Sequence, residues 1–333
     1  MMRAYPARTA LLVVGAMLLA VSGQSGSAGP AGKPVPYWAF AVNPPAPPAS
    51  TNAAALDDRP RRVPDSAAAF TQAQVTDLFS APDWHPDGHP PMPEVVSHGR
   101  KPDVYACGFC HLPNGQGRPE NSSLAGLPAS YILAQVAEFS SGRRGSSEPR
   151  HLPTTLMAGV ARNVTAPDLA EAARYFAKLR PRAWIRVVET DAVAKTRVAG
   201  WMLVDSAESG TEPIGERIIE MPVDLERTEL RDDRSGFVAY VPIGSIGKGE
   251  ALVKTGGQGT TIACGSCHGP ALRGFGTAPP LAGRSPSYIV RQLYDIQHGA
   301  REGPGTQLMQ QPVARLTLAD MLSIAAYVAS LEP

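Results

Sequence analysis

Apolar residues are distributed along the chain in three patterns, and each pattern predicts a different kind of element. From Ala10 to Val21 they form one unbroken run. Over 318–331 they recur at steps of three and four, which places them on one face of a helix, and 131–139 and 288–296 have similar helical character. Between 182 and 243 they form short runs rich in Val and Ile, which predict strands. Helical regions are therefore expected on both sides of a strand-rich segment.

The run from Ala10 to Val21 predicts an export signal. Arg3 and Arg8 precede it, and small residues follow it as far as Ala28. The run is shorter than the roughly 20 apolar residues that a membrane span needs. We therefore expect residues 1–28 to be cleaved and the protein to be periplasmic. An uncleaved N-terminus, or a membrane complex, would instead hold the protein at the membrane.

The four cysteines fall in two Cys-X-X-Cys-His segments, whose spacing suits three chemistries. The segments are Cys107, Cys110 and His111, and Cys264, Cys267 and His268. A thiol–disulfide pair should open a helix beside a βαβ pattern, and neither segment follows one. A zinc site shared between the segments would leave both histidines unexplained. In haem attachment, both sulfurs reach one porphyrin edge and the histidine faces the iron. We therefore predict two covalent c-type haems, with His111 and His268 as proximal ligands.

The two segments belong to an internal repeat. Their first cysteines are 157 residues apart, and flanking residues match at the same spacing: Gln135 with Gln292, Arg144 with Arg301, and "LAG" at 124–126 with 281–283. Beyond Arg144 the spacing is 152, and residues 155–179 align with 307–331. Each copy ends in a predicted helix that opens with T-x-x-D, a variant of the capping box. A register of this length indicates duplication of a domain.

The repeat and the composition divide the chain into five parts. We expect a signal peptide at 1–28, a Pro/Ala-rich linker at 29–65, a first haem domain at 66–181, a β-rich insert at 182–243 and a second haem domain at 244–333. Antiparallel hairpins are the predicted form of the insert, with Pro222 and Pro242 at edges or strand ends. The insert shows no catalytic constellation, so we interpret it as a docking or spacer element.

The segments "CGFCHLPNGQG", "LAGLPASYILAQ" and "FSSGRR" of the first copy, and "CGSCHGPALRG", "LAGRSPSYIVRQ" and "GAR" of the second, are typical of one family. In these segments the chain resembles the two-domain dihaem class I cytochromes c of the bacterial periplasm. The resemblance implies a mainly α fold with two tandem cytochrome c-type domains, to which this chain adds the β-rich insertion and a Pro-rich N-terminal tether. It also implies a methionine, on a loop before the last helix, as the sixth iron ligand. Met157 and Met309 occupy that place, and His151 is the alternative to Met157.

Two other groups of polar residues have less defined roles. In "PDWHPDGHPPMPE" (82–94), a proline follows both His85 and His89, and no regular element fixes their geometry. We therefore interpret this stretch as a rigid loop beside the first haem rather than a metal site. Arg144 and Arg301 could bind haem propionates, because guanidinium binds carboxylate in a bidentate way, or could lie in solvent.

The predicted ligands favour an electron carrier over an enzyme. His and Met on both irons leave no open position for a substrate. We expect a dehydrogenase or quinol-oxidising donor and a terminal oxidase or other acceptor; the net charge of +1 gives no basic surface for nucleic acid. One alternative is a cytochrome subunit of a membrane dehydrogenase or oxidase, and another is a dihaem peroxidase or oxidoreductase. A dihaem thiosulfate-oxidising enzyme would need an additional cysteine as ligand, and all four are already used.

Overall fold

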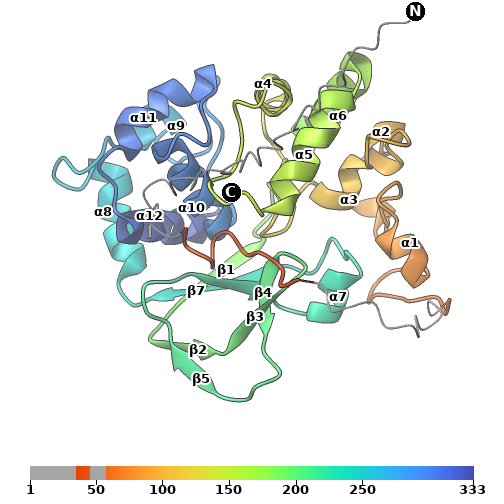
Figure 1. The fold of residues 1–333 in the computed structure, drawn as a ribbon, viewed down its shortest axis with the longest axis horizontal. Helices are drawn as coiled ribbons and strands as arrows, with labels where there is room; N and C mark the ends of the chain where they lie inside the picture. The colour runs from red at the N-terminus through yellow and green to blue at the C-terminus, as the bar shows by residue number, and fades with distance from the viewer. Residues whose placement is uncertain (1–34, 46–57) are drawn as a thin grey trace, which may run out of the picture. The chain divides into compact units, whose positions relative to one another are not determined.

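A computed structural model describes residues 35–45 and 58–333 (Figure 1). The expected signal peptide and about half of the expected linker, residues 29–34 and 46–57, lie outside the described residues. The helices are α1 Gln72–Thr76, η1 Pro86–Gly88, α2 Glu94–Ser97, α3 Cys107–His111, α4 Ala129–Ser140, α5 Leu152–Asn163, α6 Ala166–Lys178, α7 Leu225–Glu229, α8 Ser245–Thr255, α9 Gly265–His268, α10 Pro286–Gln297, η2 Pro304–Thr306, α11 Gln307–Val313 and α12 Leu318–Ser330. The strands are β1 Ile185–Thr190, β2 Ala192–Ala194, β3 Thr196–Ala199, β4 Met202–Asp205, β5 Thr211–Pro213, β6 Ile219–Pro222 and β7 Phe237–Pro242.

None of the described helices is by itself long and apolar enough to cross a membrane. The helices Pro304–Val313 and Leu318–Ser330 meet at a bend of 113°. Taken together, they are long and apolar enough for a membrane span, judged by length and composition alone.

The internal repeat recurs in the positions of the helices. α4 and α10 each have 12 residues and begin 157 positions apart, whereas α6 and α12 each have 13 and begin 152 positions apart. Thr165 and Thr317 cap the last helix of each copy by accepting a hydrogen bond from the backbone N–H three residues on. At α12 the Asp320 carboxylate also accepts from the Thr317 N–H, which completes the capping box expected from T-x-x-D.

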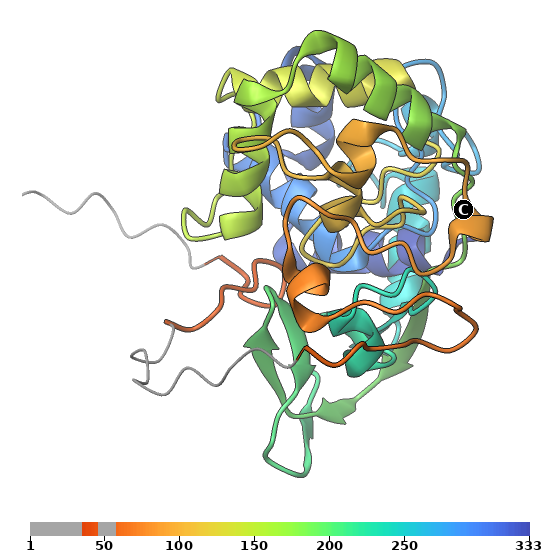
Figure 2. The same cartoon turned by 90° about the vertical axis from the view of Figure 1, so that its right-hand side faces the viewer.

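The strands lie together on one side of the helices (Figures 1 and 2). β7 is the middle strand of a three-stranded sheet, antiparallel to β6 and parallel to β1. β2 pairs with β5 and β3 with β4, both antiparallel. The prediction of antiparallel hairpins alone is therefore wrong for β1, because its partner β7 is reached by a long crossover that local sequence does not reveal. Pro222 and Pro242 end β6 and β7, as expected of residues without an amide hydrogen.

The strand segment and the second copy share one hydrophobic core. Ile219 of β6 and Val241 of β7 belong to the same buried cluster as Val290 of α10 and Ala325 of α12. The first copy has a separate core, in which Phe176 of α6 is a fully buried member. The strands are therefore packed as an extension of the second copy.

Residues 35–45 are packed against this core. Trp38 and Phe40 are buried members of the same cluster, and the Phe40 ring lies edge-on to His151, with 6.3 Å between ring centroids. Arg291 donates a hydrogen bond of 2.7 Å to the Ala39 carbonyl. The interpretation of 29–65 as an extended linker is wrong for this part, because burial of two large aromatic side chains outweighs the Pro/Ala-rich composition.

Candidate haem sites

Helix α3 places the first Cys-X-X-Cys-His segment on the wall of a cavity of about 500 Å³. Cys107, Cys110 and His111 line it, and Met157 of α5 lines it as well. Small-molecule and cofactor sites have volumes of roughly 300–1,000 Å³, so a cofactor-sized group fits. The structure thus brings all four predicted residues of the first site to one cavity.

Both predicted proximal histidines have Nδ1 held by a backbone carbonyl. Nδ1 of His111 lies 2.8 Å from the Ser122 oxygen, and Nδ1 of His268 lies 2.8 Å from the Pro279 oxygen. Because a carbonyl can only accept, Nδ1 carries the proton in both rings and Nε2 is left for a metal. Burial lowers the pKa of both histidines and so favours the neutral ring. A neutral imidazole oriented in this way is the form that binds iron.

The cysteines do not have the environment of a redox-active pair. Burial raises the pKa of the Cys107 thiol to about 12 and that of Cys264 to about 11. Redox-active Cys-X-X-Cys motifs instead depend on a thiol with a lowered pKa. All four cysteines are free of disulfides, and each pair stands directly before a histidine whose Nε2 is available. This donor set fits thioether attachment of a haem.

The second site is more open than the first. Cys264, which precedes α9, and Met309 of α11 are partly buried against the core that the strand segment shares with the second copy. His268 is buried, and Cys267 is exposed. In the first copy, Tyr105 and Leu156 line the cavity. Their counterparts in the second copy, Ile262 and Leu308, are 40% and 82% exposed. The two copies therefore place the same kinds of candidate ligand in different surroundings.

The candidate methionine ligands lie on helices rather than on loops. Met157 is within α5 and Met309 within α11, each directly before the last helix of its copy. His151 is at the N-cap of α5 and lines the same cavity as Met157. Burial lowers the pKa of His151 to about 3, its Nδ1 contacts Thr154 Oγ1 at 2.8 Å, and its Nε2 is buried without a hydrogen-bond partner. His151 is thus the alternative ligand that the structure provides at the first site.

Arg144 and Arg301 join the two copies. Arg144 donates to Gln135 of its own copy at 2.8 Å, and to Tyr288 and Gln292 of the other copy at 2.9 and 3.0 Å. Arg301 makes the equivalent contacts from the second copy. It donates to Gln292 of its own copy at 2.8 Å, and to Tyr131 and Gln135 of the first copy at 3.1 and 2.8 Å. Both arginines are buried, so the alternative of a solvated surface position is wrong. Arg144, Tyr288 and Gln292 also line the first cavity, whose wall therefore includes part of the contact between copies.

Arg231, from the strand-rich segment, is a site residue that the sequence did not reveal. Its guanidinium lies 3.5 Å from the centroid of the Phe109 ring and donates a 2.8 Å hydrogen bond to the Phe109 carbonyl. It lines the first cavity together with Trp201. Burial lowers the pKa of Arg231 to about 9, so it stays charged at neutral pH. No local motif marks Arg231, because only the fold brings it beside the "CGFCH" segment.

The duplicated helices, the two Cys-X-X-Cys-His segments and the oriented imidazoles are typical of c-type cytochromes. Residues 247–332 match the model of the cytochrome c family. The chain is 26% identical over 232 residues to the "Thiosulfate dehydrogenase electron acceptor" of Thiomonas intermedia, covering 69% of this chain and 80% of the relative. It is 26% identical over 231 residues to "Cytochrome c4" of Pseudomonas aeruginosa, covering 68% and 84%. Residues 247–332 thus match the cytochrome c family, and about two thirds of the chain is similar to c-type cytochromes that include an electron acceptor.

Two solved structures are also similar. Thiosulfate dehydrogenase from Marichromatium purpuratum aligns with a TM-score of 0.45 and 26% identity, over 68% of this chain and 37% of that one. Cytochrome c4 from Acidithiobacillus ferrooxidans aligns with a TM-score of 0.44 and 23% identity, over 68% and 98%.

Proposed function

We propose that the chain carries electrons through two covalently bound c-type haems. The first would be attached at Cys107 and Cys110 and the second at Cys264 and Cys267. The axial ligand pairs would be His111 with Met157, and His268 with Met309. The observation that carries this proposal is the pair of Nδ1–carbonyl bonds at His111 and His268, because they leave the same nitrogen available in both copies.

The residues around the first cavity support a carrier rather than an enzyme. A methionine as sixth ligand fills the coordination of the iron and raises its reduction potential relative to a second histidine. A haem held in this way exchanges electrons and leaves no position for a substrate. The chain's own residues would exclude water and hold the haem: Phe176, Leu127 and Ile132 provide apolar wall, and Arg144 provides charge.

The partners and location follow from this role. We place the carrier in the periplasm, between a dehydrogenase or quinol-oxidising donor and a terminal oxidase or other acceptor. The export signal expected at 1–28 supports that location. A second candidate role is that of a cytochrome subunit that accepts electrons from a thiosulfate-oxidising enzyme. Similarity to the electron acceptor of Thiomonas intermedia favours this role over the other membrane-complex alternatives.

Haem counting and ligand binding test the carrier proposal. The purified protein should contain two haems per chain, and a variant lacking either cysteine pair should keep one. The reduced wild type should be low-spin and should not bind carbon monoxide rapidly. A single haem in the wild type, or rapid carbon monoxide binding at one haem, would contradict the proposal and favour the oxidoreductase alternative.

Rapid mixing distinguishes the two candidate roles. The oxidised protein would be mixed with a thiosulfate-oxidising enzyme and thiosulfate, and in a parallel reaction with a quinol-oxidising donor and its quinol. Fast haem reduction only in the first reaction would assign the role of thiosulfate-linked acceptor. Fast reduction only in the second would assign the quinol-linked carrier.

A further inference from the structure

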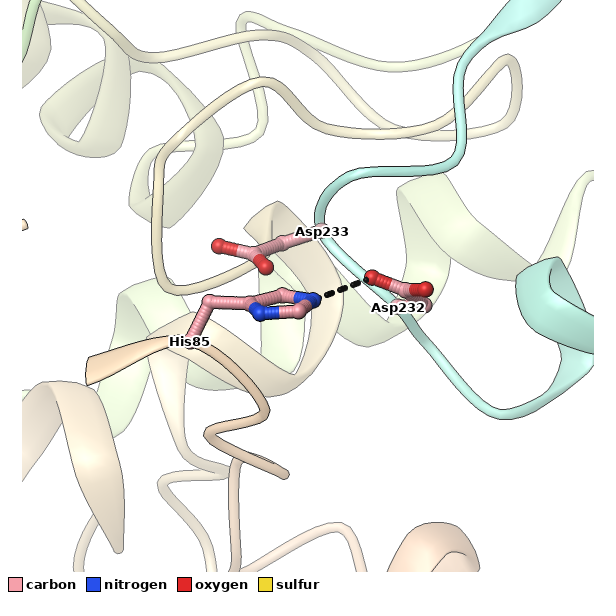
Figure 3. A group of neighbouring side chains, drawn as sticks. All are labelled: His85, Asp232 and Asp233. Carbon is pink, nitrogen blue, oxygen red and sulfur yellow. Dashed lines mark hydrogen bonds and ion pairs between the residues drawn. The ribbon is translucent and has the colours of Figure 1, made fainter. Parts of the chain in front are cut away.

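Three buried side chains, one from the first haem domain and two from the strand-rich segment, lie close together (Figure 3). His85 precedes η1, and Asp232 and Asp233 follow α7. One potential ligand atom from each residue lies within 4.8 Å of the others. His85 is a weak metal ligand when only its own loop is considered, but the fold adds two carboxylates from about 150 residues further along the chain.

The distance between His85 and Asp232 suits two neighbouring ligands of one cation. His85 Nε2 lies 3.0 Å from Asp232 Oδ1. Zinc binds nitrogen at about 2.0–2.1 Å and carboxylate oxygen at about 2.0–2.2 Å, so adjacent ligands of one ion lie roughly 3 Å apart. The Arg227 Nε donates to Asp232 Oδ2 at 2.7 Å, and the Arg234 backbone N–H donates to Oδ1 at 2.9 Å. These contacts orient the carboxylate, as outer hydrogen bonds do around metal ligands.

Asp233 provides an independent observation. Its side chain faces the His85 ring in Figure 3, the residue is 3% exposed, and its Oδ1 is buried without a hydrogen-bond partner among the described residues. Burial raises the pKa of Asp233 to about 6. A buried carboxylate oxygen without a partner destabilises the folded state, and a bound cation removes that cost.

The neighbouring ionisable pair is already satisfied. His89 Nε2 lies 3.2 Å from Asp83 Oδ1, and His89 Nδ1 lies 2.9 Å from the Pro90 carbonyl. His89 is therefore not a free hydrogen-bond partner for the Asp233 oxygen.

We propose that His85, Asp232 and Asp233 bind a divalent cation of the zinc type. One imidazole and two carboxylates are a donor set that suits zinc, with solvent as a fourth ligand. The ion would join the loop before η1 to the turn after α7. That turn also contacts the first haem domain, because Asn114 donates to the Asp233 carbonyl and Arg231 donates to the Phe109 carbonyl. The site is distinct from both haem sites, and its chemistry does not depend on them.

Zinc uptake by the haem-loaded protein tests the site. After treatment with a chelator and dialysis against zinc alone, the wild type should hold one zinc per chain by elemental analysis. Asp233→Asn should bind zinc roughly tenfold or more weakly, because it replaces a ligating carboxylate with an amide. Asp87→Asn is the matched control, since Asp87 lies in η1, two residues after His85, but pairs with Arg234 at 3.2 Å, outside the site. It should bind zinc like the wild type.

Thermal unfolding provides a second measurement. Zinc should raise the unfolding midpoint of the wild type and of Asp87→Asn, and should leave that of Asp233→Asn unchanged. Asp233→Asn should fold without zinc, because it removes a buried charge, and an unchanged haem spectrum would verify this. His85→Gln is a second variant that should also weaken zinc binding. A wild type that takes up no zinc, or equal uptake by Asp233→Asn, overturns the proposal. Zinc is counted per chain, so either result is independent of the number of haems.

Discussion

Arg144 and Arg301 are antiparallel backbone partners, and the side chain of each reaches into the opposite copy. Gln135 and Gln292 each accept from both arginines. The contact between copies is thus a polar network with approximate twofold symmetry. Because guanidinium donates along fixed directions, such a network defines how the copies are oriented as well as holding them together.

Arg144→Lys should destabilise the contact between copies. Lysine keeps the charge but cannot reproduce the directions of the guanidinium, so we expect a loss of about 2 kcal/mol in the free energy of unfolding. The double variant with Arg301→Lys should lose less than the sum of the two single losses, because both arginines share the same glutamines. Arg143→Lys, which changes an exposed arginine of the same loop, is the control and should unfold like the wild type. Additive losses in chemical denaturation would show that the two arginines act separately.

Met309→Leu and Met157→Leu should each remove the methionine-to-iron charge-transfer band of one haem and lower its reduction potential. Leucine fills a similar volume, so little packing energy is lost. Met321→Leu, in the core of α12, is the control and should keep both bands. Optical spectra and redox titration measure the effect. An unchanged spectrum in Met157→Leu would identify His151 as the ligand of the first haem.

Arg231→Gln should lower the reduction potential of the first haem by tens of millivolts. A buried positive charge disfavours the oxidised iron, which carries one more positive charge than the reduced form, and removing it has the opposite effect. Arg234→Gln, three residues along the same turn, is the control because its guanidinium pairs with exposed Asp87. Redox titration should show one shifted and one unshifted haem. Equal shifts of both haems would argue against a local effect of Arg231.

Glu220 should make the protein less stable as the pH rises. This buried carboxyl of β6 accepts hydrogen bonds from Ser285 Oγ at 2.8 Å and Ser287 N–H at 3.1 Å, at the start of α10. Burial raises its pKa above the ordinary value of 4.5. The folded state therefore retains the proton longer than the unfolded state. The stability from this group is complete below about pH 4.5 and is lost as the pH rises through the folded pKa.

Glu220→Gln should lose less stability than the wild type over this pH range, because the amide does not ionise. Denaturant unfolding at a series of pH values measures the difference. The control is Glu226→Gln, which changes an exposed carboxyl of α7. If Glu220→Gln and the wild type show the same dependence on pH, ionisation of Glu220 does not contribute.

Features that repeat or that depend on near neighbours could be predicted from the sequence. Helices α4, α6, α10 and α12 follow from apolar periodicity and T-x-x-D caps, and the candidate proximal histidines follow from Cys-X-X-Cys-His. Helices α5 and α11 instead stand where loops were expected. Features that depend on distant pairing could not. β1 finds β7 across a long crossover, and Trp38 is buried although the residues around it have the composition of a linker. Arg231 and the carboxylates near His85 reach the first copy from the strand-rich segment, which has no counterpart in the repeat.

The unequal exposure of the two copies has an energetic consequence for the proposed carrier. Solvent stabilises the charge of an oxidised haem, so two sites with the same ligands but different exposure differ in reduction potential. The first copy is lined by apolar residues and by the cation Arg231, whereas Ile262, Phe275 and Leu308 of the second are exposed. In the proposed carrier, an electron would then be held more tightly at the first haem and exchanged more readily at the second. The two copies of the repeated domain would then differ in reduction potential, and this difference would give electron transfer within the molecule a preferred direction.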